Sequence, residues 1–263
     1  MIPRKPLIAV SITSLVLAFS IADDTDAFAY SSPSVKGNTR LDSFAETKQI
    51  LERQVFHDMR QTFYCRAKYD SKKNVTIPAG FRTPSHEKRA RKVEWEHVVP
   101  TENFGRAFSE WRNGHPSCVD SKGKPFNGRN CVSKVNMTYR RMQSDMHNLY
   151  PAIGAVNAMR SNMDFTELSR ATPTSFGTCP AKISGNKFEP PEYTRGIIAR
   201  TYKYMDAAYP QFNMSNQQKR LMDAWDNKYP VQKWECVKSK RIERIQGNPN
   251  PFVKEKCVRA NLW

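Results

Sequence analysis

Six cysteines constrain the fold of this chain more than any other feature of its sequence. None of them stands in the Cys-x-x-Cys spacing that zinc sites and redox motifs use. In an exported chain, an even number of widely spaced cysteines favours disulfides over metal ligands, and six cysteines allow fifteen sets of pairs. Two pairings close short loops that contain Gly or Pro, and they leave one long-range pair. The expected disulfides are therefore Cys118–Cys131, Cys236–Cys257 and Cys65–Cys179.

The N-terminal segment has the pattern of an export signal. Two basic residues precede an apolar run from Leu7 to Ala22, which is short for a membrane span and is ended by two aspartates. Small residues allow cleavage after Ala22 or after Ala29, so residues 1–29 are interpreted as a signal peptide. We expect a periplasmic or secreted protein with no stable membrane span after processing.

The mature chain is strongly basic. Lys and Arg number 42 against 25 Asp and Glu, a formal charge of +17. Residues 1–29 contain two basic and three acidic residues, so their removal leaves +18. Such an excess favours a polyanionic partner, either nucleic acid or an anionic surface. Basic residues are spread over several runs without an evident base-reading element, which predicts contacts to phosphates rather than to base edges.

Hydrophobic spacing predicts one α+β domain that is mostly helical. Residues 30–40 are rich in Ser, Pro and Gly and are expected to be a flexible leader, followed by a single domain at 41–263. Within it we expect strands at 64–69 and 91–99, a long loop at 105–131, helical or turn-like structure at 135–148, irregular structure at 162–190, and an extended C-terminal end. The expected helices are 41–63, 151–161, 191–208, 215–228 and 238–246.

The segment Val93–Pro100 places a carboxylate, Glu96, beside an imidazole, His97. A carboxylate can bind a hard cation, and an imidazole can take a proton near neutral pH. These are two of the groups that a metal-dependent hydrolytic site requires. Neighbours on a regular strand point to opposite faces, so the two can share a site only if the strand ends or bulges there. In a regular strand, Glu96 would instead share a face with Glu94, and His97 would be buried beside Trp95.

The surrounding segment Lys92–Gly105 (KVEWEHVVPTENFG) resembles the signature of the bacterial endonuclease I family, and the resemblance continues through most of the mature chain. That family consists of secreted or periplasmic nucleases of the ββα-metal class. The resemblance implies a ββα-metal core within the helical domain, and a monomeric, Mg²⁺-dependent endonuclease with little sequence preference. DNA is the expected substrate, with RNA as a second candidate, and the products would carry 5′-phosphate and 3′-hydroxyl ends.

The resemblance also assigns roles to individual residues. His97 matches the general base, and Glu96 and Asn157 match the two protein ligands of a single Mg²⁺, a site that Mn²⁺ or Ca²⁺ can also occupy. Arg129 matches the arginine that holds the scissile phosphate, with a shift of one residue in this alignment left open. Asn148 is the alternative to Asn157 as ligand, or else a structural hydrogen-bonding residue.

Other chemistries find little support in the sequence. It contains no HExxH or paired Cys/His spacing for zinc, no GxSxG motif and no phosphate-binding Gly-rich loop ending in Lys and Ser or Thr. The competing interpretation is an exported basic protein that binds nucleic acid or another polyanion without cleaving it.

Overall fold

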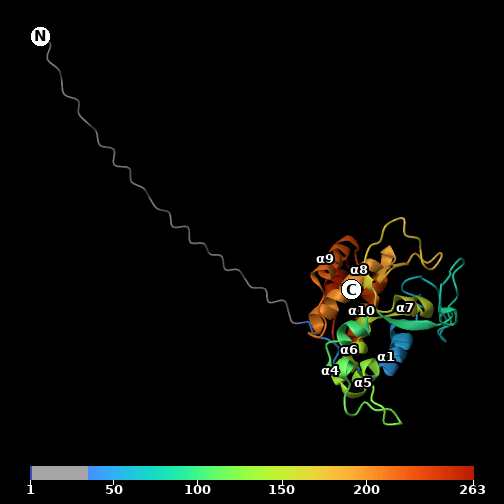
Figure 1. The fold of residues 1–263 in the computed structure, drawn as a ribbon. Coiled ribbons are helices and arrows are strands. Elements are labelled where there is room, and N and C mark those ends of the chain that lie inside the picture. The colour runs from blue at the N-terminus through green and yellow to red at the C-terminus, as the bar shows by residue number, and fades with distance from the viewer. Residues whose placement is uncertain (2–34) are drawn as a thin grey trace. The chain divides into compact units, whose positions relative to one another are not determined.

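A two-stranded antiparallel sheet carries the Glu-His motif in the structure, a computed structural model that describes Met1 and residues 35–263. Strand β1 (Val93–His97) pairs with β2 (Leu149–Ile153), so that His97 lies opposite Leu149. Helix α7 (Gly154–Arg160) follows β2 directly and packs against both strands (Figure 1). Two strands and a helix therefore meet where the sequence places the candidate site.

The partner of β1 differs from the one predicted. Residues 64–69 form no strand and take part only in isolated bridges, Gln61 with Lys68 and Tyr69 with Val75. The partner strand is β2, although its Pro151 was expected to begin a helix. The helix begins three residues later, at Gly154.

Pro151 fits in β2 because of its place in the ladder. It pairs with Trp95, and the bond from Gly154 N to Lys92 O shows which pairs exchange hydrogen bonds. Because such pairs alternate along an antiparallel ladder, the Trp95–Pro151 pair is a non-hydrogen-bonded one. The missing N–H would point away from β1, so no ladder bond is lost. On that outer edge the Pro151 carbonyl accepts from Phe63 N.

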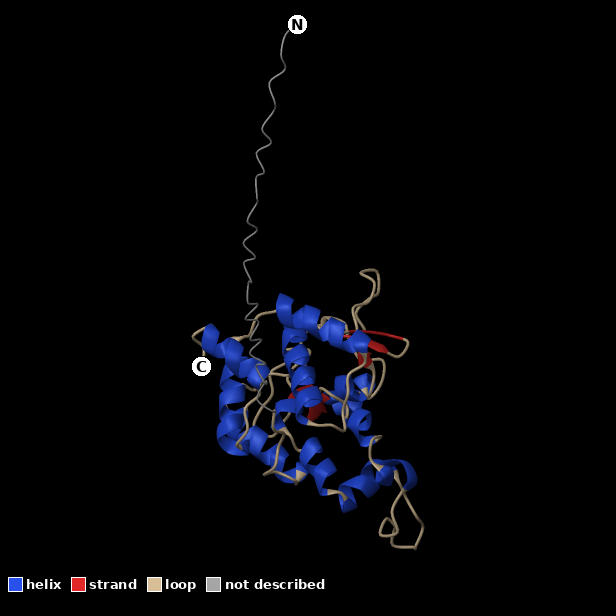
Figure 2. Cartoon of the chain, turned by 90° about the vertical axis from the view of Figure 1, so that its left-hand side faces the viewer, coloured by secondary structure: helices blue, strands red, loops and turns tan. Residues whose placement is uncertain are grey.

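Helices supply most of the regular structure (Figure 2). The fold is α+β, as predicted. A second sheet has the order β3-β5-β4 and lies within residues 162–190, which were expected to be irregular. The remaining elements are α1 (Phe44–Ile50), the π-helical η1 (Leu51–Val55), α2 (Glu87–Ala90), α3 (Thr101–Gly105), α4 (Ser109–Asn113), α5 (Gly128–Val135), α6 (Met137–Gln143), the 3-10 helix η2 (Met146–Asn148), β3 (Asp164–Phe165), β4 (Lys182–Ser184), β5 (Lys187–Glu189), α8 (Glu192–Ala208), α9 (Asn216–Lys228), α10 (Lys233–Gln246) and α11 (Pro251–Arg259).

Local capping explains several helix boundaries. Ser215 begins α9 with a capping box that includes Gln218, and this helix and α8 lie where they were predicted. Ser43 caps α1, but the helical segment ends at Val55 rather than near residue 63. The predicted loop at 105–131 contains α4 and the start of α5. The predicted extended end is mostly helix α11, because a proline at its first position, Pro251, favours a helix start.

The N-terminal end of the described chain is packed rather than flexible. Asn38 is buried, its amide N–H donates to the Tyr209 hydroxyl at 2.6 Å, and its side chain donates to Arg141 O. These bonds join the start of the domain to Asp145, a buried carboxylate that accepts from Tyr209 and from Gln246. Residues 35–40, which were expected to belong to a flexible leader, therefore include a residue that contacts the rest of the domain. The signal peptide and residues 30–34 lie outside the described residues, apart from Met1.

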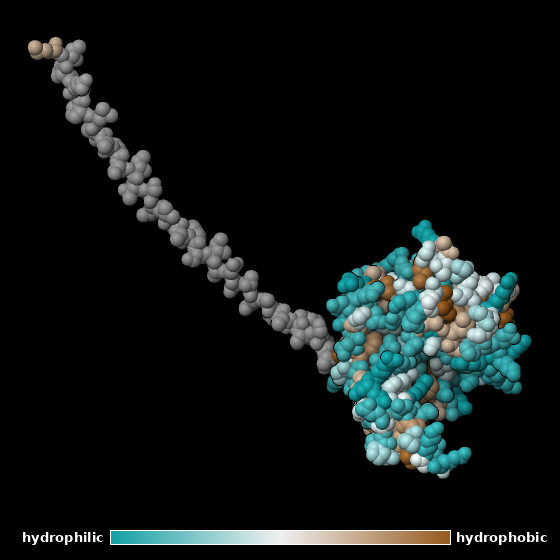
Figure 3. Space-filling model, viewed as in Figure 1, coloured by the Kyte–Doolittle hydropathy of each residue, from teal (hydrophilic) through white to brown (hydrophobic). Residues whose placement is uncertain are grey.

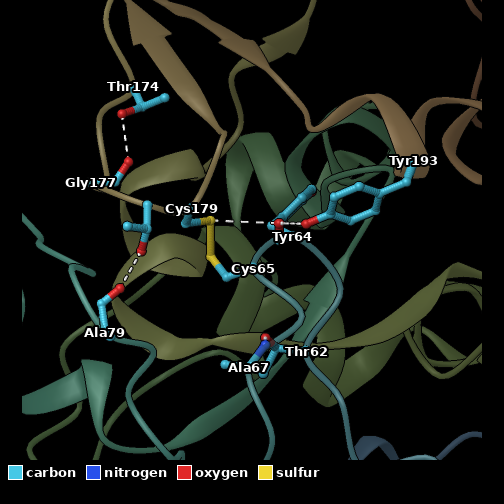
Figure 4. Close-up of a disulfide and its surroundings, with 10 residues drawn as sticks. Thr62, Tyr64, Cys65, Ala67, Ala79, Thr174, Gly177, Cys179 and Tyr193 are labelled. Atoms are coloured by element: carbon cyan, nitrogen blue, oxygen red, sulfur yellow. Dashed lines mark hydrogen bonds between the residues drawn. A yellow bond between two sulfur atoms is a disulfide. The ribbon is translucent and has the colours of Figure 1, made fainter.

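All three predicted disulfides form, and no described cysteine is free. Cys65–Cys179 spans 114 residues of sequence and lies beside Tyr64, whose carbonyl accepts from the Tyr193 hydroxyl (Figure 4). This bridge joins the segment before β1 to the segment before β4. The prediction from cysteine spacing is confirmed.

Residues 35–263 belong to one compact unit with one large hydrophobic core. A small satellite cluster surrounds the disulfide between Cys236 and Cys257. The face of this unit in Figure 3 is largely hydrophilic, with only scattered apolar residues. Within the described part of the chain, no helix has the length and apolar character that crossing a membrane requires.

Candidate active site

One cavity of about 560 Å³ brings the four predicted site residues together. Glu96 and His97 reach it from the end of β1, Asn157 from α7 and Arg129 from the first turn of α5. Phe44 of α1 also lines it. Residues that are distant in sequence therefore converge on one cavity beside the end of β1.

His97 is held in one orientation by the backbone. Its side chain is buried, and Nε2 lies 2.8 Å from the carbonyl oxygen of Gln143. A carbonyl can only accept, so the proton of the neutral ring is on Nε2 and Nδ1 keeps its lone pair. The Phe44 ring lies against the imidazole, with centroids 5.0 Å apart. Burial, helped by the charge of Arg129, lowers the pKa of His97 to about 3, which keeps the ring neutral.

Glu96 is 2% exposed and has two partners on the same oxygen. The Tyr64 hydroxyl donates to Oε1 at 2.8 Å, and Nη1 of Arg160 lies 3.0 Å from that atom. The other oxygen, Oε2, is left for a ligand in the cavity. Burial raises the pKa of Glu96 above its usual range, and Arg160 and the Tyr64 hydroxyl oppose that rise.

Asn157 is oriented by a carboxylate. Its Nδ2 donates to Oε2 of Glu94 at 2.8 Å, and Glu94 is held in turn by two bonds from Arg89, at 2.7 and 2.5 Å. With the amide nitrogen on Glu94, the amide oxygen is free to bind elsewhere. Helix α7 approaches this carboxylate so closely that a Cβ on Gly154 would lie 2.8 Å from Oε1 of Glu94. Glycine at the helix start therefore permits this arrangement.

Asn148 has the structural role that the sequence left open. It is fully buried, and its side-chain amide accepts from Val99 N at 2.7 Å and donates to Val99 O at 2.9 Å. These two bonds fix the chain just beyond β1. Asn148 is not among the residues that line the cavity, whereas Asn157 is.

Arg129 supplies positive charge to the cavity wall. Its guanidinium lies over the Phe44 ring, 5.6 Å from the centroid, and no described carboxylate forms an ion pair with it. Lys48 and Lys73 line the same cavity. A guanidinium that has no anionic partner is available to a phosphate.

The oxygen donors of the cavity suit a hard divalent cation. Oε2 of Glu96 and the amide oxygen of Asn157 are ligand types that Mg²⁺ and Ca²⁺ prefer. Across residues 35–263 no group of three or more His, Cys, Asp and Glu residues could hold a metal ion.

Several side chains that support the site were missed in the sequence, including Glu94 and Arg89 beside Asn157. Tyr64 and Arg160 contact Glu96, and Phe44 packs between His97 and Arg129. Only for Arg160 did the sequence contain a signal, because it follows Asn157 by three residues and so lies on the same face of a helix.

Comparison with known proteins shows the family of the chain. The family model of Endonuclease I matches residues 38–257, which is most of the chain. This chain belongs to the endonuclease I family. The resemblance inferred from the sequence is thus confirmed, and membership makes the protein a nuclease of a metal-dependent family.

Several relatives named as nucleases align with this chain over most of their length. An extracellular deoxyribonuclease of Aeromonas hydrophila is 36% identical over 222 residues, which is 82% of this chain and 90% of that protein. Endonuclease-1 of Buchnera aphidicola subsp. Baizongia pistaciae is 36% identical over 226 residues, 83% of this chain and 86% of its own. A periplasmic deoxyribonuclease of Aeromonas hydrophila is 35% identical over 82% of this chain and 86% of its own.

Proposed function

We propose that this protein is an exported, Mg²⁺-dependent endonuclease that hydrolyses DNA with little sequence preference. The observation that carries the proposal is the convergence of Glu96, His97, Arg129 and Asn157 on one cavity. A proton acceptor, a phosphate-binding cation and two hard oxygen ligands are the groups that phosphodiester hydrolysis needs. We assign them to a ββα-metal core formed by β1, β2 and α7.

The residues divide the chemistry between them. His97 accepts a proton from the attacking water on Nδ1, while the Nε2–H bond to Gln143 O keeps the ring in place. Arg129 binds the non-bridging oxygens of the scissile phosphate. Glu96 and Asn157 would hold the cation, which when bound would supply positive charge to the phosphate and to the departing 3′ oxygen. As the water oxygen bonds to phosphorus, the P–O3′ bond breaks; the departing 3′ oxygen takes a proton from solvent and becomes a 3′-hydroxyl, and the phosphate stays on the 5′ end.

Export is supported by three observations. The N-terminal segment reads as a signal peptide, and three disulfides require an oxidising compartment to form. Relatives are named extracellular and periplasmic deoxyribonucleases. We therefore propose that the protein acts in the periplasm or outside the cell.

Cleavage of supercoiled plasmid tests the proposal. We expect Mg²⁺-dependent nicking that EDTA abolishes, and a loss of roughly a hundredfold or more in His97→Ala, because a positioned base contributes that much. His147→Ala is the matched control, since His147 is also buried with Nε2 on a backbone carbonyl, at 3.1 Å from Asn248 O, but lies outside the cavity. It should keep activity within a few-fold of wild type.

The same experiment separates the competing function. A protein that binds plasmid in Mg²⁺ without nicking it would be a polyanion-binding protein, and Glu96 and His97 would then be structural. Equal activity in His97→Ala and wild type would leave a nuclease but remove His97 as its base.

A further inference from the structure

We infer that Arg160 is a positioning residue that holds the Glu96 carboxylate and the backbone carbonyl of His97 in a fixed relation at the end of β1. The inference rests on the proposed function, in which these two adjacent residues act on one phosphate. It concerns how the fold lets them do so. Nothing in the sequence motif itself explains it, because neighbours on a strand project to opposite faces.

The contacts of Arg160 are concentrated at this point of the chain. Its side chain is fully buried, Nη1 donates to His97 O at 2.9 Å, and Nη2 donates to Val98 O at 2.7 Å. Consecutive carbonyls of a regular strand point in opposite directions, yet these two reach the same guanidinium. The strand pattern is therefore broken between His97 and Val98, where β1 ends.

The same guanidinium fixes the first member of the pair. Nη1 lies 3.0 Å from Oε1 of Glu96, so one planar group holds the carboxylate and the two carbonyls that follow it. A lysine carries the same charge but lacks the planar fork that reaches several acceptors at fixed angles. The guanidinium also stacks on the Phe165 ring, 4.4 Å from its centroid, which limits its freedom.

Helix α7 carries both Arg160 and the second proposed metal ligand, Asn157. Asn157 and Arg160 are three residues apart and so lie on one face of the helix, which packs against β1. Asn157 thus presents its amide to the cavity, and Arg160 on the same helix donates to the backbone carbonyls of His97 and Val98. Any displacement of Arg160 would move Glu96 relative to His97.

The alternative is that Arg160 only balances the charge of a buried carboxylate. Arg200 offers a matched control, because it is also fully buried and forks onto a buried carboxylate, with two bonds of 2.7 Å to Glu235. It lies on α8 and does not line the cavity. Arg160→Lys and Arg200→Lys therefore each remove a buried guanidinium fork, the first from two backbone carbonyls beside the cavity and the second from a carboxylate distant from it.

The experiment compares stability and steady-state cleavage in the full-length processed protein. Both lysine variants should lower Tm to a similar degree. Only Arg160→Lys should lower kcat, by about tenfold or more with KM for DNA little changed, since a misplacement of about 1 Å can cost about a hundredfold. A folded Arg160→Lys with the kcat of wild type would overturn the inference, as would an equal loss of kcat in Arg200→Lys.

A second measurement does not depend on nuclease activity. The ring Nε2–H of His97, assigned by its absence in His97→Ala, should give a protected NMR signal in wild type and in Arg200→Lys because it is bonded to Gln143 O. We expect this signal to shift or to exchange rapidly in Arg160→Lys. An unchanged signal would refute the positioning role, whereas a wild-type protein that cuts no DNA would refute only the proposed function.

If Arg160→Lys does not fold, a double variant answers the same question. Glu96→Gln with Arg160→Gln removes both buried charges together and leaves neither of them unpaired. Its His97 ring signal is compared with that of Glu96→Gln alone. Loss of the signal in the double variant alone supports the inference, and its persistence in both contradicts it.

Discussion

Glu94 determines which way the Asn157 amide points. Its Oε2 accepts from Asn157 Nδ2, and Arg89 holds the carboxylate from the other side. Partners of this kind orient the groups that bind a metal and raise affinity without touching it. Glu94 therefore belongs to the site although no cation is expected to contact it.

We predict that Glu94→Gln raises the Mg²⁺ concentration needed for half-maximal cleavage by roughly tenfold, because the amide of Asn157 loses its charged partner. Glu110→Gln is the matched control, since Glu110 accepts in the same way from Asn136 Nδ2 at 3.0 Å but is not a cavity residue. Calorimetric titration with Mn²⁺ checks affinity directly. Identical metal dependence in both variants would show that Glu94 does not orient Asn157.

Lys238 is a buried cation away from the cavity. Its Nζ donates to the carbonyls of Met146 and His147, at 3.2 and 3.4 Å, and lies 3.5 Å from the centroid of the Tyr150 ring. Burial lowers the pKa of Lys238 to about 7. The neutral amine can still donate both hydrogen bonds, so the fold tolerates its deprotonation.

This pKa predicts a particular pH dependence of stability. Because the pKa of Lys238 is lower in the folded than in the unfolded state, the unfolded state binds more protons between pH 7 and about 10, and stability rises with pH. The unfolding free energy of wild type should therefore increase relative to Lys238→Met by up to about 1.4 kcal/mol per pH unit. Urea titrations at several pH values measure it, and a constant difference would exclude this assignment.

At the scale of elements, the disulfides stabilise loops of very different length. Cys65–Cys179 spans 114 residues and Cys118–Cys131 spans 13. A longer closed loop removes more entropy from the unfolded chain, about 4.7 kcal/mol for 100 residues against about 3 kcal/mol for 15. We expect the double alanine variant at Cys65 and Cys179 to lose more stability than that at Cys118 and Cys131. Denaturant unfolding gives the order, and the reverse order would contradict the loop-length explanation.

Some elements could be predicted because their signals are local. The Ser215 cap and helical spacing defined α9, and cysteine spacing defined the three disulfides. Strand β2 could not be predicted in this way, because Pro151 is acceptable only at a ladder position that its partner strand determines. Likewise, residues 64–69 have strand-like composition but no neighbouring strand to complete a ladder.

In the candidate site, too, some residues could be predicted from the sequence and others could not. Glu96, His97, Arg129 and Asn157 were named from a resemblance to a family, and the fold places them around one cavity. Their supporting residues act through tertiary contacts, so composition and spacing do not reveal them. Tyr64, for example, reaches Glu96 only because its segment folds back beside β2, where Phe63 N donates to Pro151 O.

For the whole molecule, the formal charge of +18 on residues 30–263 should dominate recognition. Binding to phosphates releases counterions, so affinity should fall steeply as salt rises, and equally for unrelated sequences. Fluorescence anisotropy with random-sequence duplexes in EDTA measures both effects without cleavage. A few strongly preferred sequences, or a shallow salt dependence, would indicate base contacts instead of phosphate contacts.

The position of Asp145 has a consequence for the order of assembly. Its carboxylate lies where Asn38 near the start of the domain meets Gln246 of α10, with the Tyr209 hydroxyl between them. A chain that emerges N-terminus first therefore carries this carboxylate without its tyrosine partners until α8 and Tyr209 have been released, and without Gln246 until α10 has been released. A charge that is buried without its partners is costly. The hydrogen bonds around Asp145 are thus complete only in a chain that includes α10.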